Sequence, residues 1–271
     1  FAEADHLDVL KAAQIVYDEG IGKPILLGNK DIIKELMAEI TFDADLPIID
    51  PKSKEETQRR NRFAQVYWEK HKRNGISLLD AQKWMRERNY FAAMMINLGE
   101  AESLVTGYSR SYPSVAKPMI ELIGKAEGVE RVAATNIMMT KKGPLFFSDT
   151  AFNINPNEQE LIQIARMTHR IMKLFGFDPY LAMLSYSNFG SAKSKSANKA
   201  SKAVKYIHEH FPDINIDGEI QADFAMSRTM REEKFPFSKL QNKKVNGLIF
   251  PNLNSSNIAY KLIKSLNEIE S

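Results

Sequence analysis

The chain has 271 residues, of which 44% are hydrophobic and 26% are charged, and its formal net charge is +3. This composition is typical of a globular protein with room for two domains, and so small a charge does not indicate a nucleic-acid-binding protein. The absence of cysteine excludes disulfides and cysteine metal sites. Without a long apolar run or a secretion signal, the sequence predicts a cytoplasmic protein that is not bound to a membrane. Because the chain begins at Phe1 rather than Met, we expect it to be a piece of a longer protein.

Apolar periodicity and capping signals predict alternating helices and strands in the first half of the chain. A capping box at Ser77 and a glycine at position 99 predict one long helix over 78–98, whose section 90–96 is apolar all round and therefore buried. The other predicted elements are helices over 5–20, 31–37, 52–75 and 114–123, and strands over 24–28, 46–49 and 102–107. This alternation favours a mostly parallel sheet with helices on both faces.

The pattern becomes richer in strands after residue 127, which predicts two α/β domains over 1–127 and 128–271, the first of them incomplete at the chain ends. The predicted strands of the second half are 132–139, 145–148, 181–186, 214–218 and 247–250, and the predicted helices are 158–175, 222–233 and 257–267. A further helix that carries lysines follows the strand over 181–186.

The main functional signal is the Ser-Asn-Phe-Gly-Ser turn over 187–191, here called the glycine turn, which joins that strand to the lysine-bearing helix. A turn of this kind directs free backbone N–H groups and the positive end of the helix dipole outward, which favours a phosphate. Five lysines follow without an intervening acid: Lys193, Lys195, Lys199, Lys202 and Lys205. An ordinary turn followed by a solvated lysine face explains the same composition equally well.

Ligands of parallel α/β sheets bind beyond the carboxyl ends of the strands. Arg110 lies in the loop after the strand predicted over 102–107. It could bind a phosphate through bidentate hydrogen bonds, or it could be a surface arginine in a turn. Asp217 and Glu219 lie on the same side of another strand and could divide acid and base roles, although a capping role is favoured. The histidines match no metal-binding pattern, and dinucleotide and P-loop fingerprints are missing, so we expect no metal or dinucleotide site.

Several segments resemble, in order, the phosphate acetyl/butyryltransferase family. They are Phe1-Ala2-Glu3-Ala4-Asp5, Tyr90-Phe91-Ala92 with Leu98-Gly99-Glu100-Ala101, Asn155-Pro156, the glycine turn, Ile216-Asp217-Gly218-Glu219, and Phe250-Pro251-Asn252 with Asn257-Ile258-Ala259-Tyr260. The resemblance implies a two-domain α/β fold of the isocitrate/isopropylmalate dehydrogenase type, with coenzyme A bound between the domains.

The glycine turn resembles one branch of this family, the domain fused to the C-terminus of bacterial NADP-dependent malic enzymes. Free-standing transferases typically have Ser-Thr-Lys-Gly-Ser at this turn, so Phe189 stands where they have a lysine. They also tend to have arginines where this chain has Lys117 and His71. The Ser-Arg-Gly segment of active members has no counterpart up to Ser271, so we expect no catalytic residue in this chain.

The resemblance therefore implies a catalytically inactive regulatory domain that binds acetyl-CoA as an effector. Malate would be oxidatively decarboxylated to pyruvate in a separate malic-enzyme domain of the same polypeptide, which would hold NADP and a divalent metal, and the whole would form a homo-oligomer, at least a dimer. The expected acetyl-CoA-binding residues are Ser187, Asn188, Phe189, Gly190 and Ser191, with anion contacts from Arg110, Ser111 and Lys117. The alternatives are an active phosphate acetyltransferase, which moves acetyl between acetyl phosphate and CoA, and an oligomerisation scaffold without a ligand.

Overall fold

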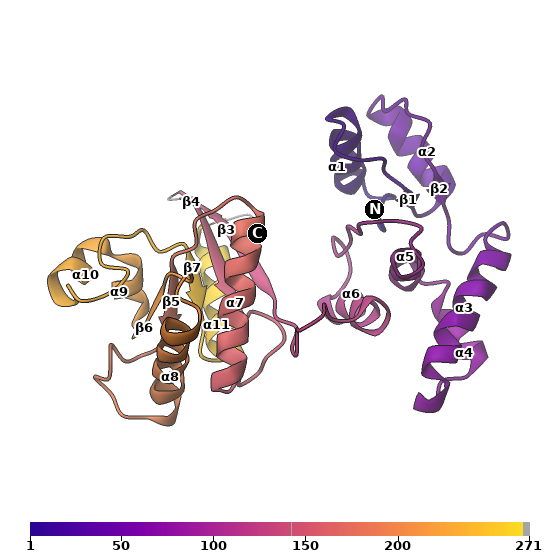
Figure 1. The fold of residues 1–271 in the computed structure, drawn as a ribbon. Helices are drawn as coiled ribbons and strands as arrows, with labels where there is room; N and C mark the ends of the chain where they lie inside the picture. Colours follow the sequence, from indigo (N-terminus) through magenta and orange to yellow (C-terminus); the bar gives the residue numbers. More distant parts are fainter. Residues whose placement is uncertain (142, 268–271) are drawn as a thin grey trace. The chain divides into compact units, whose positions relative to one another are not determined.

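The computed structural model describes residues 1–141 and 143–267, and the chain divides into two compact units, Phe1–Ala126 and Glu127–Ser271 (Figure 1). Each unit has a sheet and hydrophobic clusters of its own. Within the described residues, no helix combines the length and the apolar composition that crossing a membrane requires.

Unit 1 is mostly helical, and its sheet is short. Strand β1 (Leu26–Leu27) pairs in parallel with β2 (Ile48–Ile49), while the first residues of the chain run beside β1 through the bond from the Leu27 N–H to the Phe1 carbonyl. Residues 102–107 were predicted as a strand, but they follow an irregular path. The helices are α1 (Leu7–Asp18), α2 (Lys30–Glu39), α3 (Thr57–His71), η1 (Lys72–Asn74), α4 (Leu78–Trp84), α5 (Arg88–Asn97), α6 (Tyr112–Pro118) and η2 (Met119–Ile123).

The long helix predicted over 78–98 is broken into α4 and α5. The capping box at Ser77 forms as predicted, since the Ser77 hydroxyl accepts from the Asp80 N–H. At the other end of α4, the backbone hydrogen bonds change from the α-helical spacing of four residues to a spacing of three. The N–H groups of Arg86 and Glu87 donate to the carbonyls of Lys83 and Trp84. Glu87 then adopts an extended conformation and α5 begins at Arg88, so the chain turns between the two helices.

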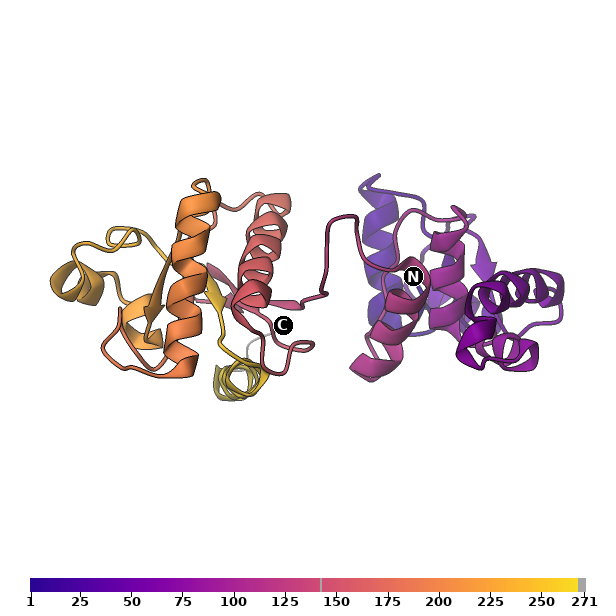
Figure 2. The ribbon, with the colours of Figure 1, turned by 60° about the horizontal axis from the view of Figure 1, so that its bottom comes forward.

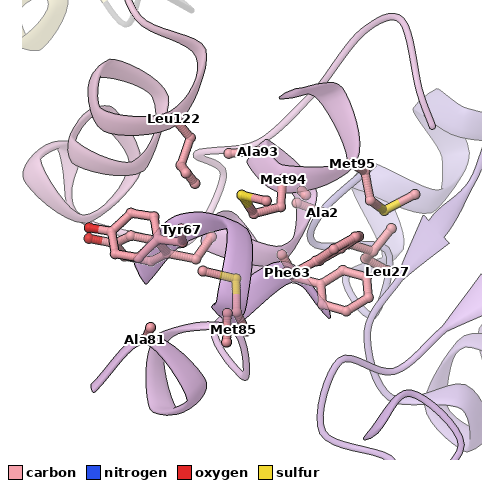
Figure 3. Close-up of a cluster of buried hydrophobic side chains, with 14 of the residues drawn as sticks. Ala2, Leu27, Phe63, Tyr67, Ala81, Met85, Ala93, Met94, Met95 and Leu122 are labelled. Atoms are coloured by element: carbon pink, nitrogen blue, oxygen red, sulfur yellow. The ribbon is translucent and has the colours of Figure 1, made fainter. Parts of the chain in front are cut away.

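The core of unit 1 forms around the apolar section of α5. Met94 and Met95 are buried, as the all-round apolar pattern predicted, and they pack in a cluster with Phe63, Tyr67 and Leu122 (Figure 3). Burying each such side chain contributes about 1.5–3 kcal/mol, so this cluster contributes strongly to the stability of unit 1. The methionines act here as core residues.

Unit 2 is built on a five-stranded mixed sheet in the order β3-β4-β7-β5-β6. The outer strand β3 runs antiparallel to β4, and the other three neighbouring pairs are parallel. The α/β class is therefore confirmed, while the sheet is mixed because β3 pairs with β4 in the antiparallel sense. The strands are β3 (Thr135–Thr140), β4 (Gly143–Ser148), β5 (Leu181–Leu184), β6 (Ile216–Ile220) and β7 (Gly247–Ile249).

Helices cover both faces of this sheet. Figure 2 shows α7 and α8 side by side on one face, with α11 on the opposite face. Side chains alternate accordingly along β5: Leu181 and Met183 pack with α7 and α8, whereas Ala182 and Leu184 pack with α9 and α11. The helices are α7 (Glu158–Leu174), α8 (Lys195–His210), α9 (Ala222–Met226), α10 (Arg228–Lys234) and α11 (Leu253–Asn267), so the helix predicted over 222–233 is two helices that meet at Ser227.

Candidate functional site

The glycine turn lies between β5 and α8, at the carboxyl edge of the parallel strands of unit 2 (Figure 1). Its backbone N–H groups all find acceptors within unit 2: Ser187 to Ser185 Oγ, Asn188 to Ser191 Oγ, Phe189 to the Glu219 carbonyl, Gly190 to Glu219 Oε1, and Ser191 to the Asn188 carbonyl. The expectation of free N–H groups in the turn is therefore wrong. Because every donor is occupied, the turn is a fixed scaffold rather than an open anion cradle.

The buried carboxylate of Glu219 fixes the glycine turn through hydrogen bonds from the protein interior. Its Oε1 accepts from the Ser187 hydroxyl at 2.9 Å and from the Gly190 N–H at 2.6 Å, while its Oε2 has no hydrogen-bond partner in the described residues. Asp217, on the same strand, instead accepts from the Ser238 hydroxyl and the Lys239 N–H, both at 2.7 Å. The two carboxylates thus anchor different loops and share no partner, which matches an anchoring role better than a divided acid and base role.

Phe189 adopts a left-handed backbone conformation, with φ at +47°. Its ring makes edge contacts with Phe235 and Phe237, each at 5.0 Å between centroids. A non-glycine residue in this region costs about 1–2 kcal/mol, which the aromatic contacts help to offset. The position that the resemblance assigns to a lysine in transferases is therefore occupied by a packed, uncharged ring.

Unpaired N–H donors and exposed lysines of unit 2 gather just after the turn, at the start of α8. Ser194 caps the helix by accepting from the Ala197 N–H at 3.1 Å, and the N–H groups of Lys195 and Ser196 have no acceptor in the described residues. Lys193 and Lys202 are exposed, and neither ammonium group pairs with a carboxylate in the described residues. The N–H groups without an acceptor thus lie at the start of α8 rather than in the glycine turn.

Lys199 differs from the other four lysines because it is half-buried and points into unit 2. Its ammonium donates to Asn155 Oδ1 at 2.9 Å, to the Pro156 carbonyl at 2.7 Å and to the Pro251 carbonyl at 2.8 Å. Burial lowers the pKa of Lys199. This lysine joins the loops that follow β4 and β7 to helix α8, so its role is structural.

In unit 1, a second buried carboxylate organises the loop that carries Arg110. Glu3 accepts from the N–H groups of Gly107, Tyr108 and Ser109 at 2.7, 3.0 and 2.8 Å, and from the Ser109 hydroxyl. Burial by itself would raise the pKa of Glu3, but the hydrogen bonds from Ser109, Gly107 and Tyr108 outweigh it and lower the pKa to about 2. The carboxylate therefore stays ionised and holds the loop in place.

This low pKa makes unit 1 sensitive to acid. Because the folded-state pKa lies below the ordinary value of 4.5, Glu3 stabilises the fold above pH 4.5 and loses this contribution as the pH falls toward 2. At pH 7 we expect Glu3→Gln to lower the free energy of unfolding by about 2–3 kcal/mol. The difference in this free energy between the variant and the wild type should become smaller as the pH falls from 4.5 to 2. Urea unfolding across this range tests the prediction, with the exposed Glu35→Gln as the matched control. A difference that stays constant with pH would contradict it.

The other two predicted contacts of unit 1 are Ser111, just before α6, and Lys117, within α6. Ser111 precedes the helix, and its hydroxyl lies 3.3 Å from that of Ser114. The Lys117 ammonium lies 3.8 Å from Glu121 Oε1 and 5.6 Å from the centroid of the Trp84 ring, so a carboxylate and an aromatic ring already neighbour its charge. These two residues and Arg110 belong to unit 1, whereas the glycine turn belongs to unit 2.

The chain is similar to two groups of known proteins. The family described as phosphate acetyl/butaryl transferase matches residues 1–271. The NADP-dependent malic enzyme of Haemophilus influenzae is 34% identical over 97% of the chain, which spans only 35% of that relative's length. The phosphate acetyltransferase of Thermoanaerobacterium thermosaccharolyticum is 36% identical over 95% of the chain and 79% of its own length. A solved phosphotransacetylase from Streptococcus pyogenes is 32% identical, with a TM-score of 0.83 over 100% of this chain and 82% of its own.

Proposed function

This chain belongs to the phosphate acetyl/butaryl transferase family, and from this we propose that it is an acetyl-CoA-binding regulatory domain of an NADP-dependent malic enzyme. In the proposal, the fold is of the isocitrate/isopropylmalate dehydrogenase type, and oxidative decarboxylation of malate occurs in another domain of the polypeptide. That domain, not this chain, would hold NADP and a divalent metal. The proposal also includes assembly of the polypeptide into a homo-oligomer.

The observation that carries this proposal is the state of Phe189 in the glycine turn. Transfer of acetyl from acetyl phosphate requires cations that hold the phosphate leaving group. Here an aromatic ring occupies the place of the lysine, and its packing on Phe235 and Phe237 leaves no cation at this point of the turn. The similarity to malic enzymes supports the same conclusion, because a chain that spans 35% of such a relative leaves room for a separate catalytic domain.

Acetyl-CoA recognition would use the surface formed by the glycine turn and the start of α8. Asn188, Gly190 and Ser191 are at least partly accessible there, whereas Ser187 is buried and its hydroxyl is engaged with Glu219. The free N–H groups at Lys195 and Ser196, together with the exposed lysines, suit the phosphates of the coenzyme. Regulation then requires that acetyl-CoA bind two states of the whole protein with different affinities.

Two measurements test the proposal. Calorimetric titration should show saturable binding of acetyl-CoA that weakens as salt rises from about 0.05 M to about 0.5 M, because the contacts are largely ionic. A mixture of acetyl phosphate and CoA should form acetyl-CoA no faster with the protein than without it. Turnover of about 1 per second or more would overturn the regulatory role. If acetyl-CoA fails to bind and no turnover occurs, only a scaffold role remains.

The second candidate is an active phosphate acetyltransferase, which is favoured by the 36% identity to a phosphate acetyltransferase along nearly the whole chain. In that reaction, the CoA thiolate attacks the acetyl carbonyl carbon, the bond from acetyl to phosphate breaks, and phosphate leaves with the electron pair. The transferase assay above separates the two candidates directly, since only this one predicts turnover.

A further inference from the structure

Helix α11 of unit 2 carries apolar side chains on two of its faces. On the inner face, Tyr260 and Ile263 pack against the hydrophobic cluster beneath the helix. On the outer face, the side chains of Ile258, Leu262 and Leu266, here called the outer stripe, are 65%, 55% and 73% exposed. In Figure 2, no other described element of unit 2 lies on the outer side of α11. A surface helix normally turns one apolar face to its own core and a polar face to water, so the outer stripe indicates a second contact.

The outer stripe is a continuous apolar line without charges. Its three residues are spaced four apart, so they lie above one another over about 12 Å of the helix axis. The charged residues of α11 are Lys261 and Lys264, which lie about 100° and about 160° around the helix from Leu262. Ser255 and Ser265 border the stripe instead. Small side chains at these places allow another helix to approach closely.

Helix α8 shows how a solvent-facing helix of the same unit is built. Val204 and Ile207 are buried on its inner face, and no large hydrophobic side chain is exposed along Lys195–His210. Its exposed positions include Lys202 and Lys205. The outer stripe of α11 departs from this pattern, although both helices pack on the same sheet. This difference indicates that the outer stripe is covered in the assembled protein.

The symmetry of the outer stripe favours a second copy of this chain as the covering partner. Leu262 lies at its centre, and Ile258 and Leu266 are each four residues away. If two copies of α11 pack antiparallel across a two-fold axis at Leu262, the two Leu262 side chains meet. Ile258 of each copy then meets Leu266 of the other. Contacts between identical subunits require such a self-complementary pattern, and here the lysines stay outside the contact.

The area that a stable dimer needs shows which other elements take part. A standard interface uses about 20–30 residues on each partner, which is more than the outer face of one helix supplies. Two further exposed apolar side chains lie close by in the sequence of this face: Met226 in α9 and Phe237 after α10. Their neighbours Ala225 and Phe235 belong to the same cluster as Ile263, so α9 and α11 cover the same face of the sheet. The outer stripe is therefore the centre of a larger apolar face.

We propose that the outer stripe is the centre of an interface between two copies of this chain, in which α11 packs antiparallel to its counterpart across a two-fold axis at Leu262. This inference rests on the homo-oligomer that the proposed function includes, and it assigns a surface to that assembly. It does not depend on acetyl-CoA, because the residues of the outer stripe are not part of the glycine turn.

The first test is the oligomeric state of the 1–271 protein by analytical ultracentrifugation. We expect the wild type to be a dimer at about 10 μM, within the range of affinities of standard interfaces. Leu262→Glu places two carboxylates at the axis and should raise the dissociation constant of the dimer by about hundredfold or more. The matched control is Leu174→Glu, which changes an exposed leucine at the end of α7 and should leave the dimer unchanged. Circular dichroism verifies that each variant is folded.

The second test measures the register of the two helices. The chain contains no cysteine, so any disulfide between copies comes from the introduced residue. Leu262→Cys should form a linked dimer under mild oxidation, because the two sulfur atoms meet at the axis. Ile258→Cys should not link to itself, since its two copies are too far apart for the roughly 7 Å limit between Cα atoms. A mixture of Ile258→Cys and Leu266→Cys should form linked heterodimers.

Three results would overturn the interface. A wild type that stays monomeric at about 100 μM would mean that another domain of the polypeptide covers the stripe. A dimer that Leu262→Glu leaves intact would mean that the copies meet elsewhere. Ile258→Cys that links to itself faster than Leu262→Cys would exclude the antiparallel arrangement. Failure of acetyl-CoA to bind to an intact dimer would reject the proposed acetyl-CoA-binding role alone and would support the interface as a separate property.

Discussion

Gly218→Ala should unfold unit 2 or leave it only marginally stable. Gly218 lies in β6 with φ at +139°, and a Cβ there would lie 2.5 Å from the Met183 carbonyl oxygen and 3.1 Å from Met183 Cβ. The first obstacle is the backbone of β5, which pairs with β6 and with β7, so it cannot move aside without breaking the sheet. We expect a loss of about 3–5 kcal/mol, a large share of the about 5–15 kcal/mol that stabilises a typical domain.

A second glycine separates this clash from the ordinary strain of a left-handed residue. Gly176 follows α7 with φ at +78°, and nothing lies within 4 Å of the position of its Cβ. Gly176→Ala should therefore cost only about 1–2 kcal/mol. Urea unfolding of both variants, followed by circular dichroism, measures the difference. Equal losses in the two variants would mean that backbone strain, rather than the contact with β5, makes glycine necessary at position 218.

The parts of unit 2 that sequence could predict are those that depend on local patterns. The run Leu181–Leu184 is apolar throughout because both faces of β5 are covered by helices, which is the pattern of a central parallel strand. The helix α7 has a capping box at Asn157 and a strong apolar stripe, and its predicted range 158–175 differs from the structure by one residue. The polar loops that follow the strands of unit 2 were predicted from local patterns in the same way.

The parts that could not be predicted depend on contacts between residues far apart in the chain. Glu3 accepts a hydrogen bond from the N–H of Gly107, which is 104 residues away in the sequence. Glu219 accepts one from the N–H of Gly190, which is 29 residues away. No local pattern distinguishes these glutamates from solvated ones, so the sequence could not show that the donors of the glycine turn are occupied. The break at Arg86 was missed for a related reason: the segment between α4 and α5 has no proline or glycine to mark it.

Three loops are held by the same device, a buried carboxylate that accepts several hydrogen bonds from one loop. Glu3 holds residues 107–109, Glu219 holds the glycine turn, and Asp149 accepts from the N–H groups of Ala151, Phe152 and Asn153. The two oxygens of one carboxyl group accept from several donors at once and leave the outer surface of the loop free for other contacts. Ligand recognition at the glycine turn would therefore depend on a residue that the ligand does not touch.

Glu219→Ala should accordingly lower both stability and acetyl-CoA affinity. The change leaves the Ser187 hydroxyl and the Gly190 N–H without their buried acceptor, and each such loss costs about 1–3 kcal/mol. We expect a loss of about 3 kcal/mol or more in the free energy of unfolding of unit 2. If acetyl-CoA binds beside the glycine turn as proposed, its affinity should fall by about tenfold or more, because the turn must then be ordered on binding.

Glu219→Gln is the control that identifies what the carboxylate contributes. Glutamine keeps one oxygen for Ser187 and Gly190 and places its NH₂ where Oε2 has no partner in the described residues, so it should cost only about 1 kcal/mol. It should also preserve acetyl-CoA binding within about threefold. The measurements are urea unfolding, calorimetric titration and hydrogen exchange of the Gly190 amide, which should accelerate in the alanine variant alone. If alanine and glutamine are equally damaging, the charge of Glu219, rather than its hydrogen bonds, holds the turn. If neither changes exchange at Gly190, the turn is fixed without Glu219.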